Sequence, residues 1–344
     1  MRIVVDIAHP AHVHFFRNFI WEMERQGHEI KIIARNKDIT VNLLKAYNFQ
    51  YYLLDVKSSS FLKKILNMPL LDFEVLQQVK AFKPDLFMGI ASWRAAQVAF
   101  FLRKKSIIFD DTEHASKQNM AYRLFASKIC TPSCFQKDYG KKQIRYNGYH
   151  ELAYLHPNRF TPDSAILDEL NLTEGDPFII IRFVSWQASH DVGQYGIRDK
   201  VGLVKALEEY GRVLITSEGT LPPELQSYQI RVSPEKLHDL LYYATLYVGE
   251  GATTASESAV LGTHAIYVNT LRLGYTDEEG EKYGLVYTFS DPLKMEKEVF
   301  EKAMELLKGP NIRAKGKKKR EILLNDKIDV TEFMIKLAEK TAHQ

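Results

Sequence analysis

At 344 residues the chain is too long for one ordinary hydrophobic core, and a prior of about 150 residues per domain predicts two domains. Hydrophobic residues make up 45% of the chain and charged residues 26%, a globular balance that excludes a largely disordered protein. The net charge of +3 is near neutral for this length, so no molecule-wide field attracts nucleic acid, and nucleic acid is not an expected partner.

Cysteine usage and the first residues bear on the compartment. Only Cys130 and Cys134 are present, too few for a disulfide framework or a zinc site, which favours free thiols in a reducing cytoplasm. The N-terminal apolar stretch is interrupted by Asp6 and is too short for a signal peptide or a membrane span. We therefore expect a cytoplasmic protein, peripheral at the inner face of the membrane at most.

The first half alternates short apolar runs with amphipathic stretches. Strands are predicted at residues 2–7, 29–34, 85–90, 106–110 and 128–131. Helices are predicted at residues 13–26 and 93–103. Such alternation is typical of a parallel sheet covered by helices on both faces, so residues 1–160 are predicted to form an N-terminal Rossmann-like domain.

A linker is predicted at HELAYLHPNRFTP, residues 150–162, because it has two prolines and no clean periodicity. A second alternation follows it. Strands are predicted at residues 178–183, 212–216, 246–248 and 265–268. Helices are predicted at residues 200–210, 234–244, 255–261, 293–307 and 330–339. Residues 161–325 are thus predicted to form a second Rossmann-like domain, and residues 326–344 are expected to pack back on the first.

The fold class that follows is α/β, with two Rossmann-like domains whose parallel sheets face a central cleft. Open α/β sheets bind ligands outside the carboxyl ends of their strands, so function is expected in the loops after strands.

The clearest local signal is GEGATTASESAVLGTHAI, residues 249–266, which follows a strand and opens a helix. Gly249 and Gly251 allow a tight turn, and a helix start with Thr253 and Thr254 presents N–H groups and a positive dipole end to a diphosphate. Glu257, about one turn inside the helix, is an acceptor-only carboxylate suited to the two hydroxyls of a ribose. A Gly- and Thr-rich helix cap with an exposed glutamate is an equal alternative.

This segment resembles the donor-site helix of the GT-B glycosyltransferases, including the MurG-like enzymes, in which the glutamate commonly holds the ribose of the nucleotide. The resemblance implies that role for Glu257, with Thr253 and Thr254 beside the phosphates. His264 stands where the superfamily often has proline. The donor-binding residues predicted together are Arg182, Trp186, Ser217, Gly249, Gly251, Ala252, Thr253, Thr254 and Glu257.

The loop AHPAHVHFF after the first strand carries His9, His12 and His14. It resembles the first loop of MurG-like and glucuronosyltransferase-like enzymes, where a histidine lies near the acceptor hydroxyl, although Pro10 and Ala11 replace the usual glycines. A neutral histidine there accepts the proton of the attacking oxygen, and His12 and His14 are not distinguished. Helix capping and solvated histidines are the alternatives, and a three-histidine metal site is less favoured.

The segment FDDTEHA, residues 109–115, follows a predicted strand and precedes a helix. Ionisable groups at the end of a buried strand favour a cleft function, so Asp111, Glu113 and His114 are candidates for binding an acceptor or acting as the base. The alternative is a helix cap by Asp111 or Thr112.

In RFVSWQASHD, residues 182–191, Arg182 closes a strand and is suited to pair with a donor phosphate, while Trp186 is suited to stack on a sugar or base. Residues 272–284, RLGYTDEEGEKYG, are predicted to be a long polar loop, and similar loops in GT-B enzymes contact the donor sugar.

The chain as a whole resembles the uncharacterised archaeal and bacterial family DUF354, which belongs to the GT-B superfamily. The matching segments run from end to end of the chain: DIAHPAHVHFF, GHEIKIIAR, FDDTEHA, YNGYHELAYLHP, RFVSWQASHD, EGATTASESAVLGTHAI and DKIDVT.

The function expected is transfer of a sugar from a nucleotide diphosphate sugar, a UDP-sugar above others, to a glycan or lipid-linked acceptor, with no metal and no further cofactor. A UDP-sugar 2-epimerase-like enzyme and a non-catalytic nucleotide-sugar binding protein are the alternatives. The basic run KGKKKR, Lys315 to Arg320, is a candidate for contact with anionic lipid, although such runs are more often solvated helix faces.

Overall fold

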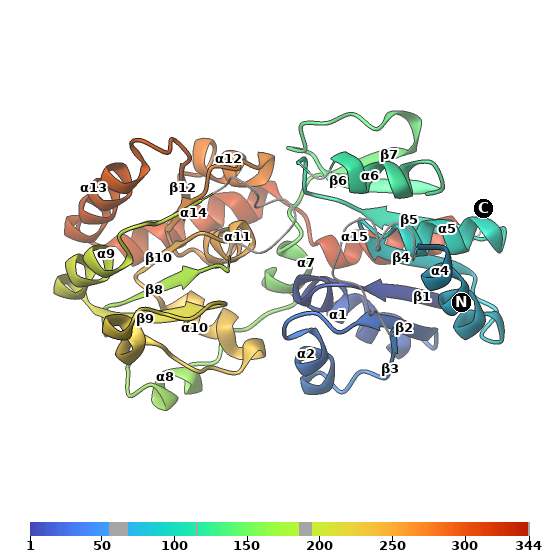
Figure 1. Cartoon of the computed structure of the whole chain (residues 1–344), viewed down its shortest axis with the longest axis horizontal. Helices are drawn as coiled ribbons and strands as arrows, with labels where there is room; N and C mark the ends of the chain where they lie inside the picture. The colour runs from blue at the N-terminus through green and yellow to red at the C-terminus, as the bar shows by residue number, and fades with distance from the viewer. Residues whose placement is uncertain (55–67, 115, 186–194, 343–344) are drawn as a thin grey trace. The chain divides into compact units, whose positions relative to one another are not determined.

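The structure is a computed structural model that describes residues 1–54, 68–114, 116–185 and 195–342. The chain divides into two compact units, drawn in Figure 1. Unit 1 is Met1–Tyr154 together with Ile328–Gln344, and unit 2 is Leu155–Lys327.

Unit 1 is built on a seven-stranded sheet in the order β3-β2-β1-β4-β5-β6-β7, in which every pair is parallel. Its strands are β1 Arg2–Ile7, β2 Glu29–Arg35, β3 Tyr51–Leu54, β4 Leu86–Ile90, β5 Lys105–Phe109, β6 Lys128–Pro132 and β7 Gln143–Tyr146. The order reverses direction between β1 and β4, so the loops after these two strands diverge and open the sheet's carboxyl edge to a ligand.

Helices cover both faces of this sheet. They are α1 Pro10–Arg25, α2 Thr40–Ala46, α4 Met68–Lys80, α5 Trp93–Phe101, α6 Ser116–Arg123, η1 Gly140–Lys142, α7 Leu152–Leu155 and α15 Val330–Ala342. α1 packs against α2 and α15 on one face, and α5 packs against α4 and α6 on the other. On the α5 face, Val4, Phe87 and Ile108 of the strands meet Ala95 and Val98, which gives a continuous apolar core.

Unit 2 is built on a five-stranded parallel sheet in the order β12-β11-β10-β8-β9. Its strands are β8 Phe178–Phe183, β9 Arg212–Ser217, β10 Leu246–Gly249, β11 Ala265–Val268 and β12 Val286–Phe289. Its helices are α8 Ala165–Glu169, α9 Lys200–Leu207, η2 Glu208–Tyr210, η3 Pro223–Tyr228, η4 Pro234–Lys236, α10 Leu237–Tyr243, α11 Ala252–Leu261, α12 Gly274–Glu281, α13 Met295–Lys308 and α14 Ile312–Asp326.

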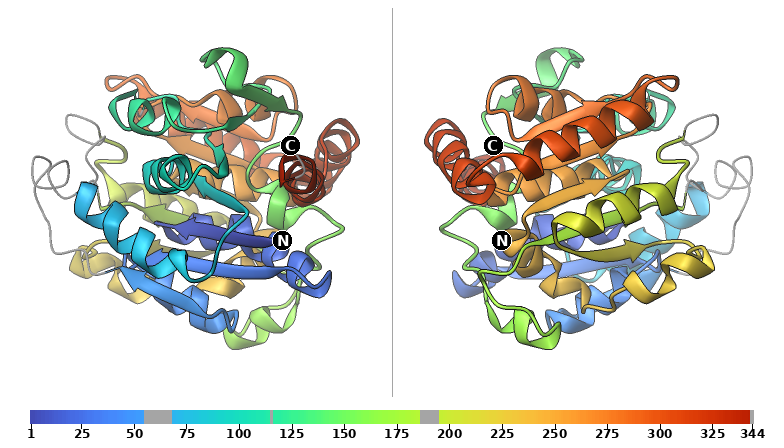
Figure 2. Two further views of the ribbon diagram at one scale, coloured as in Figure 1. Left: turned by 90° about the vertical axis from the view of Figure 1, so that its right-hand side faces the viewer. Right: turned by 90° about the vertical axis from the view of Figure 1, so that its left-hand side faces the viewer.

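Two helical layers enclose the second sheet as well. α9 and α13 lie side by side over one face (Figure 2, right), where Leu203, Val204 and Val299 join the strand residues in one core. α11 lies on the other face between α10, α12 and α14. The prediction of an α/β fold with two parallel sheets is confirmed.

Element boundaries show where local signals were misread. α1 begins at Pro10 rather than at residue 13, because Pro10 stands at the first helical position and His9 caps the helix by accepting the Ala11 N–H at Nδ1, 3.2 Å. The predicted polar loop at residues 272–284 contains the helix α12. The prediction of an unbroken loop was wrong because its buried positions, Tyr275, Thr276 and Glu279, are only partly apolar.

The basic run also belongs to a helix, α14, whose Gly316 lies against the end of α11. A Cβ on Gly316 would come 2.1 Å from the Gly262 carbonyl oxygen. Lys319 donates to the Gly284 carbonyl and Arg320 to the Val260 carbonyl, so part of the run satisfies helix-end carbonyls of α11 and α12. Lys315, Lys317 and Lys318 are exposed.

α15 returns the chain to unit 1. Met334 and Ala338 are fully buried, and the Thr331 hydroxyl donates to the Ala153 carbonyl, 2.7 Å. Within the residues that the structure describes, no helix is both long enough and apolar enough to cross a bilayer.

Candidate functional site

Loops at the carboxyl edge of the first sheet bring together His12, Asp111 and His150. His12 lies in the first turn of α1, Asp111 follows β5, and His150 lies in the segment just before α7. The Asp111 Oδ2 and His150 Nδ1 atoms are 2.9 Å apart, and the His150 ring packs on Phe15 of α1 at 4.5 Å between centroids. Phe15 lies three residues after His12, so both occupy the same side of α1.

The Asp111–His150 pair has a defined electrostatic role. Burial by itself would raise the pKa of Asp111, but the charge and hydrogen bond of His150 and the hydrogen bond from Thr112 outweigh it and hold that pKa below its usual range. The carboxylate is therefore ionised at neutral pH. Because the Asp111 carboxylate accepts at Nδ1 of His150, that ring nitrogen carries a proton.

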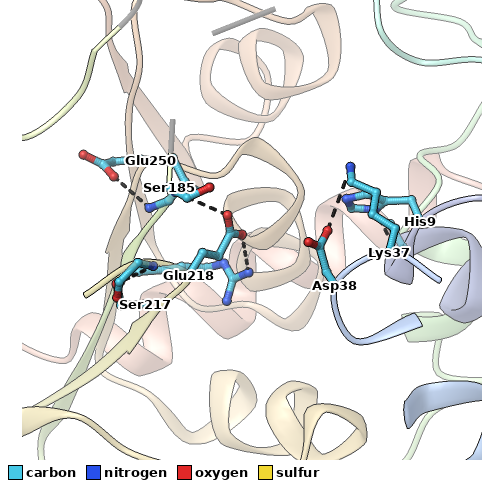
Figure 3. Close-up of polar contacts among 11 residues, drawn as sticks. His9, Lys37, Asp38, Ser185, Ser217, Glu218 and Glu250 are labelled. Carbon is cyan, nitrogen blue, oxygen red and sulfur yellow. Dashed lines mark hydrogen bonds and ion pairs between the residues drawn. The ribbon is translucent and has the colours of Figure 1, made fainter. Parts of the chain in front are cut away.

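His12 is half-buried and neutral. Burial, reinforced by His9 and His150, lowers its pKa well below the usual histidine value, while Asp111 opposes the shift. Its Nδ1 accepts the Ala8 N–H at 3.3 Å, which favours the tautomer with the proton on Nε2. Lys37, which lies beside His9 and 3.9 Å from Asp38 in Figure 3, adds a further positive charge near this loop.

Other predicted residues of unit 1 lie apart from this cluster. His14 is buried, 3.2 Å from the Tyr47 hydroxyl, with its ring beside Tyr154, so it packs inside the unit. Glu113 is buried and faces the loop after β6, where its Oε1 accepts the Gln136 N–H, whereas His114 is exposed. Across the described residues no three His, Cys, Asp or Glu side chains are placed to hold a metal ion.

A buried ion pair that the sequence analysis missed lies where the strand order reverses. Asp6 of β1 accepts two bonds from Arg94 Nη2, at 2.8 and 2.9 Å, and one from Ser92, which caps α5. Both members of the ion pair are almost fully buried. Gly89 makes the approach possible, since a Cβ there would come 2.7 Å from the Ser92 Cβ. In the sequence, this ion pair was indicated only by the charged Asp6 inside the first apolar strand and by the segment SWR, residues 92–94, after β4.

In unit 2, the N-terminus of α11 is open. Gly251 precedes the helix with no side-chain cap, and Ala252, Thr253 and Thr254 form the first turn directly after β10. Neither Gly249 nor Gly251 has a positive φ, and the two differ in the space around them. A Cβ on Gly249 would come 2.2 Å from the Tyr247 hydroxyl, whereas one on Gly251 would meet Val184 only at 3.7 Å. Among the described residues, the first turn thus offers backbone N–H groups to which the N-cap residue makes no side-chain bond.

Glu257 is 5% exposed and its Oε1 lies 2.9 Å from Nε2 of His238. His238 lies on α10, the helix beside α11, and is 1% exposed. The contact fixes the orientation of the carboxylate. No local pattern in the sequence pointed to His238, because a single histidine in an amphipathic helix is usually a packing residue.

Arg182 is the penultimate residue of β8, and Ser217 ends the adjacent strand β9. Arg182 Nη2 lies 2.8 Å from Glu218 Oε1, and the Ser217 hydroxyl closes a turn by donating to the Gly219 carbonyl at 2.9 Å. Arg182 is near the α11 start, since its Nε lies 4.0 Å from a Cβ built on Gly251. Trp186 lies outside the described residues.

Two glutamates hold the loop after β8 by its backbone, as Figure 3 shows around Ser185. Glu218 Oε2 accepts the Ser185 N–H at 3.3 Å, and Glu250, which is 1% exposed, accepts the Val184 and Ile197 N–H groups, each at 2.9 Å. Glu250 therefore ties both ends of the segment between Val184 and Ile197 to the start of α11. Glu250 lies inside the motif GEGATT, residues 249–254, but no role was predicted for it from the sequence.

Comparison with solved structures defines the class of fold. The UDP-GlcNAc 2-epimerase of Neisseria meningitidis bound to UDP-GlcNAc matches with a TM-score of 0.69 at 10% identity, over 99% of this chain and 100% of that chain. The spinosyn forosaminyltransferase SpnP matches with 0.68 at 13% identity, and the glycosyltransferase VinC in complex with dTDP with 0.67 at 12% identity, each over the full length of both chains. The predicted GT-B fold is confirmed, and identities this low show the fold alone.

The family follows from the sequence match. The family described as "Protein of unknown function (DUF354)" matches residues 1–336, so the chain belongs to it, as its motifs predicted. An uncharacterized protein of Methanocaldococcus jannaschii is 24% identical over 274 residues, which cover 75% of this chain and 79% of that protein.

Proposed function

We propose that this protein transfers a sugar from a nucleotide diphosphate sugar, a UDP-sugar above others, to a hydroxyl of a glycan or lipid-linked acceptor. The observation that carries the proposal is the open N-terminus of α11 after β10, with Arg182 beside it. Uncapped N–H groups, a positive dipole end and a guanidinium together favour a diphosphate.

Donor binding in this scheme divides between two parts of α11. The diphosphate lies at the first turn, where Arg182 exchanges its contact with Glu218 for a phosphate oxygen. The ribose hydroxyls donate to Glu257, whose orientation His238 holds. Similar proteins support this choice of ligand, since one of them is bound to UDP-GlcNAc and another is in complex with dTDP.

Acceptor activation is assigned to His12. Its lowered pKa keeps the ring neutral, it is more accessible than His150, and ionised Asp111 nearby stabilises the imidazolium that forms. The acceptor oxygen bonds to the anomeric carbon as that carbon's bond to the diphosphate oxygen breaks. The acceptor proton passes to His12 Nε2, which requires Nδ1 to carry the other proton and to release the Ala8 N–H. The diphosphate leaves with the bonding electron pair, and neither a metal nor a further cofactor takes part.

The test is incubation of the full chain with a panel of nucleotide sugars, with and without glycan and lipid-linked acceptors, followed by NMR. Nucleotide release that depends on an acceptor is the expected result. Isomerisation at C2 would establish the epimerase alternative, which the same fold allows, and tight binding without turnover would establish a binding protein.

Calorimetry with UDP tests the donor site separately. Glu257→Ala is expected to weaken UDP binding by 10-fold or more, on the order of the 1.4 kcal/mol that a tenfold change represents, and His238→Gln by less. Glu224→Ala, at an exposed position of η3, is the matched control and leaves binding unchanged. Unchanged UDP affinity in Glu257→Ala would remove the ribose role.

A further inference from the structure

The amino edge of the first sheet, opposite the edge that carries His12 and Asp111, exposes three large apolar side chains. Phe100 is 56% exposed, Phe101 65% and Leu124 75%. The two phenylalanines end α5, with ring centroids 6.0 Å apart, and Phe100 contacts Phe125 at 5.3 Å, next to Leu124. Phe100 and Phe101 thus form an exposed aromatic pair at the end of α5, and Leu124 is exposed just after α6, beside the residue that Phe100 contacts. These three residues are here named the α5–α6 tip.

Their exposure is not a consequence of helix amphipathicity. The buried residues of α5 are Arg94, Ala95, Ala96, Val98 and Ala99, so the helix already has a complete inner face. Phe100 and Phe101 lie beyond it at the last two positions. A contiguous apolar surface of this kind on a folded unit indicates contact with another apolar phase.

Positive charge surrounds the α5–α6 tip. Arg103, Lys104 and Lys105 are exposed in the turn between α5 and β5, and the Lys142 ammonium lies at the Leu124 carbonyl, 2.8 Å. The parallel sheet causes this gathering, because every turn that enters a strand lies at the same edge.

The lysine side chains at this edge of the sheet are close enough for one to lower the pKa of another. The pKa of Lys128 is lowered by burial, then by Lys340 and Lys105, which belong to two other segments of unit 1. Asp85 pairs with one cation of this turn, its Oδ1 lying 4.0 Å from the Lys104 ammonium. Apolar side chains among exposed cations fit the interface of an anionic bilayer, where rings enter the headgroup region and cations meet lipid phosphates.

We propose that the α5–α6 tip anchors this protein to an anionic lipid surface. The anchor leaves the opposite edge of the sheet, with its candidate acceptor residues, free of the lipid. It replaces the basic run at residues 315–320 as the principal contact, since that run uses Lys319 and Arg320 to bond backbone carbonyls of unit 2 and Lys317 lies over the Tyr242 ring. The inference does not depend on the proposed sugar chemistry.

Co-sedimentation of the full chain with vesicles tests it. Vesicles of equal parts phosphatidylglycerol and phosphatidylcholine are expected to bind the protein, whereas phosphatidylcholine alone is not. Replacement of Arg103, Lys104 and Lys105 by Gln weakens binding on the order of 100-fold, because each cation near such a surface contributes about 1 kcal/mol. The Phe100→Ser, Phe101→Ser variant keeps weak binding that is lost at high salt.

The matched control carries Gln at Lys315, Lys317 and Lys318, the exposed lysines of α14, and is expected to bind as the unmodified protein does. Equal loss of binding in this control, or normal binding by both tip variants, overturns the proposal. Light scattering provides a further check: a dimer that becomes a monomer in the phenylalanine variant, with no vesicle binding, would assign the tip to self-association. All of these residues are exposed, so circular dichroism should show unchanged folding.

Discussion

His12, His14 and His150 show how one residue type takes different roles by position. His14 packs between tyrosines, His150 orients toward Asp111, and His12 remains half-buried at the helix start with a depressed pKa. Sequence alone left His12 and His14 equivalent, because two positions of the same helix turn differ only in which side of α1 they occupy. His150 lies far along the chain and became visible only through its contact with Asp111.

Activity of His12 variants gives the first prediction. His12→Ala is expected to lower kcat by about 100-fold or more while UDP affinity stays the same, because a general base contributes roughly 10²–10⁴-fold. The acidic limb of kcat/KM for the unmodified protein should lie below pH 6.5, the ordinary histidine value, since the folded environment disfavours the imidazolium. Rates measured from about pH 4.5 to 8.5 check this, and an acidic limb above pH 7 would point to another base.

Glu279 supports a second prediction, on stability. Burial raises its pKa to about 8, although the Ser256 hydroxyl donates to it at 2.6 Å. The folded state therefore holds a proton that the unfolded chain loses near the ordinary glutamate pKa of 4.5, so the unfolding free energy declines as pH rises from there to about 8.

The variant Glu279→Gln has no carboxyl group at this position, so its unfolding free energy should not show this decline with pH. Chemical unfolding at about pH 5 and pH 9 should show a difference from the unmodified protein of about 1 kcal/mol or less at the lower pH and a gain on the order of 4 kcal/mol at the higher one. Glu281→Gln, on the same helix but exposed, serves as the control. Parallel pH profiles for the two variants would contradict the assignment.

At the scale of elements, α11 is the centre of unit 2. Its start is open toward the carboxyl edge of the sheet, its middle carries Glu257 against α10, and its end is covered by α14. Gly262 ends the helix in the left-handed conformation, with φ of 87°, and Gly316 of α14 lies against it. The position of Glu257 therefore depends on helices that are distant in sequence.

Gly316→Ala tests this packing. The added methyl group collides with the Gly262 carbonyl oxygen, and the separation of two helix backbones costs about 2 kcal/mol or more, as overpacking does. A lower Tm together with weaker UDP binding is expected from thermal unfolding and calorimetry. Gly175→Ala, where nothing lies within 4 Å of the new Cβ, should leave both unchanged. A stable Gly316→Ala variant would mean that α14 is not held at this distance.

At the scale of the whole molecule, the chain completes unit 2 before it returns to finish unit 1. α15 supplies buried side chains to the first unit, and Phe333 stacks on Tyr146 with centroids 5.1 Å apart. Unit 1 therefore depends on the last residues of the chain, while unit 2 is continuous in sequence.

Met334→Ala should accordingly destabilise one unit and not the other. Loss of a fully buried methionine side chain costs about 2–5 kcal/mol. Hydrogen exchange is expected to show faster exchange in β4 and β5, which α15 covers, with unchanged protection in β8 and β10. Lys336→Ala, at an exposed position of the same helix, is the control. Equal loss of protection in both sheets would mean that the two units unfold together.

The sequence by itself determined the alternation of strands and helices, both parallel sheets, the family and the segment 249–262 as the candidate donor site, because these depend on periodicity and contiguous motifs. Only the tertiary structure decided which distant side chains meet: His150 with Asp111, Arg94 with Asp6, His238 with Glu257, and Glu250 with the loop after β8. The physical reason is that each of these contacts joins segments that no local pattern connects, and their partners are chosen by sheet order and helix packing.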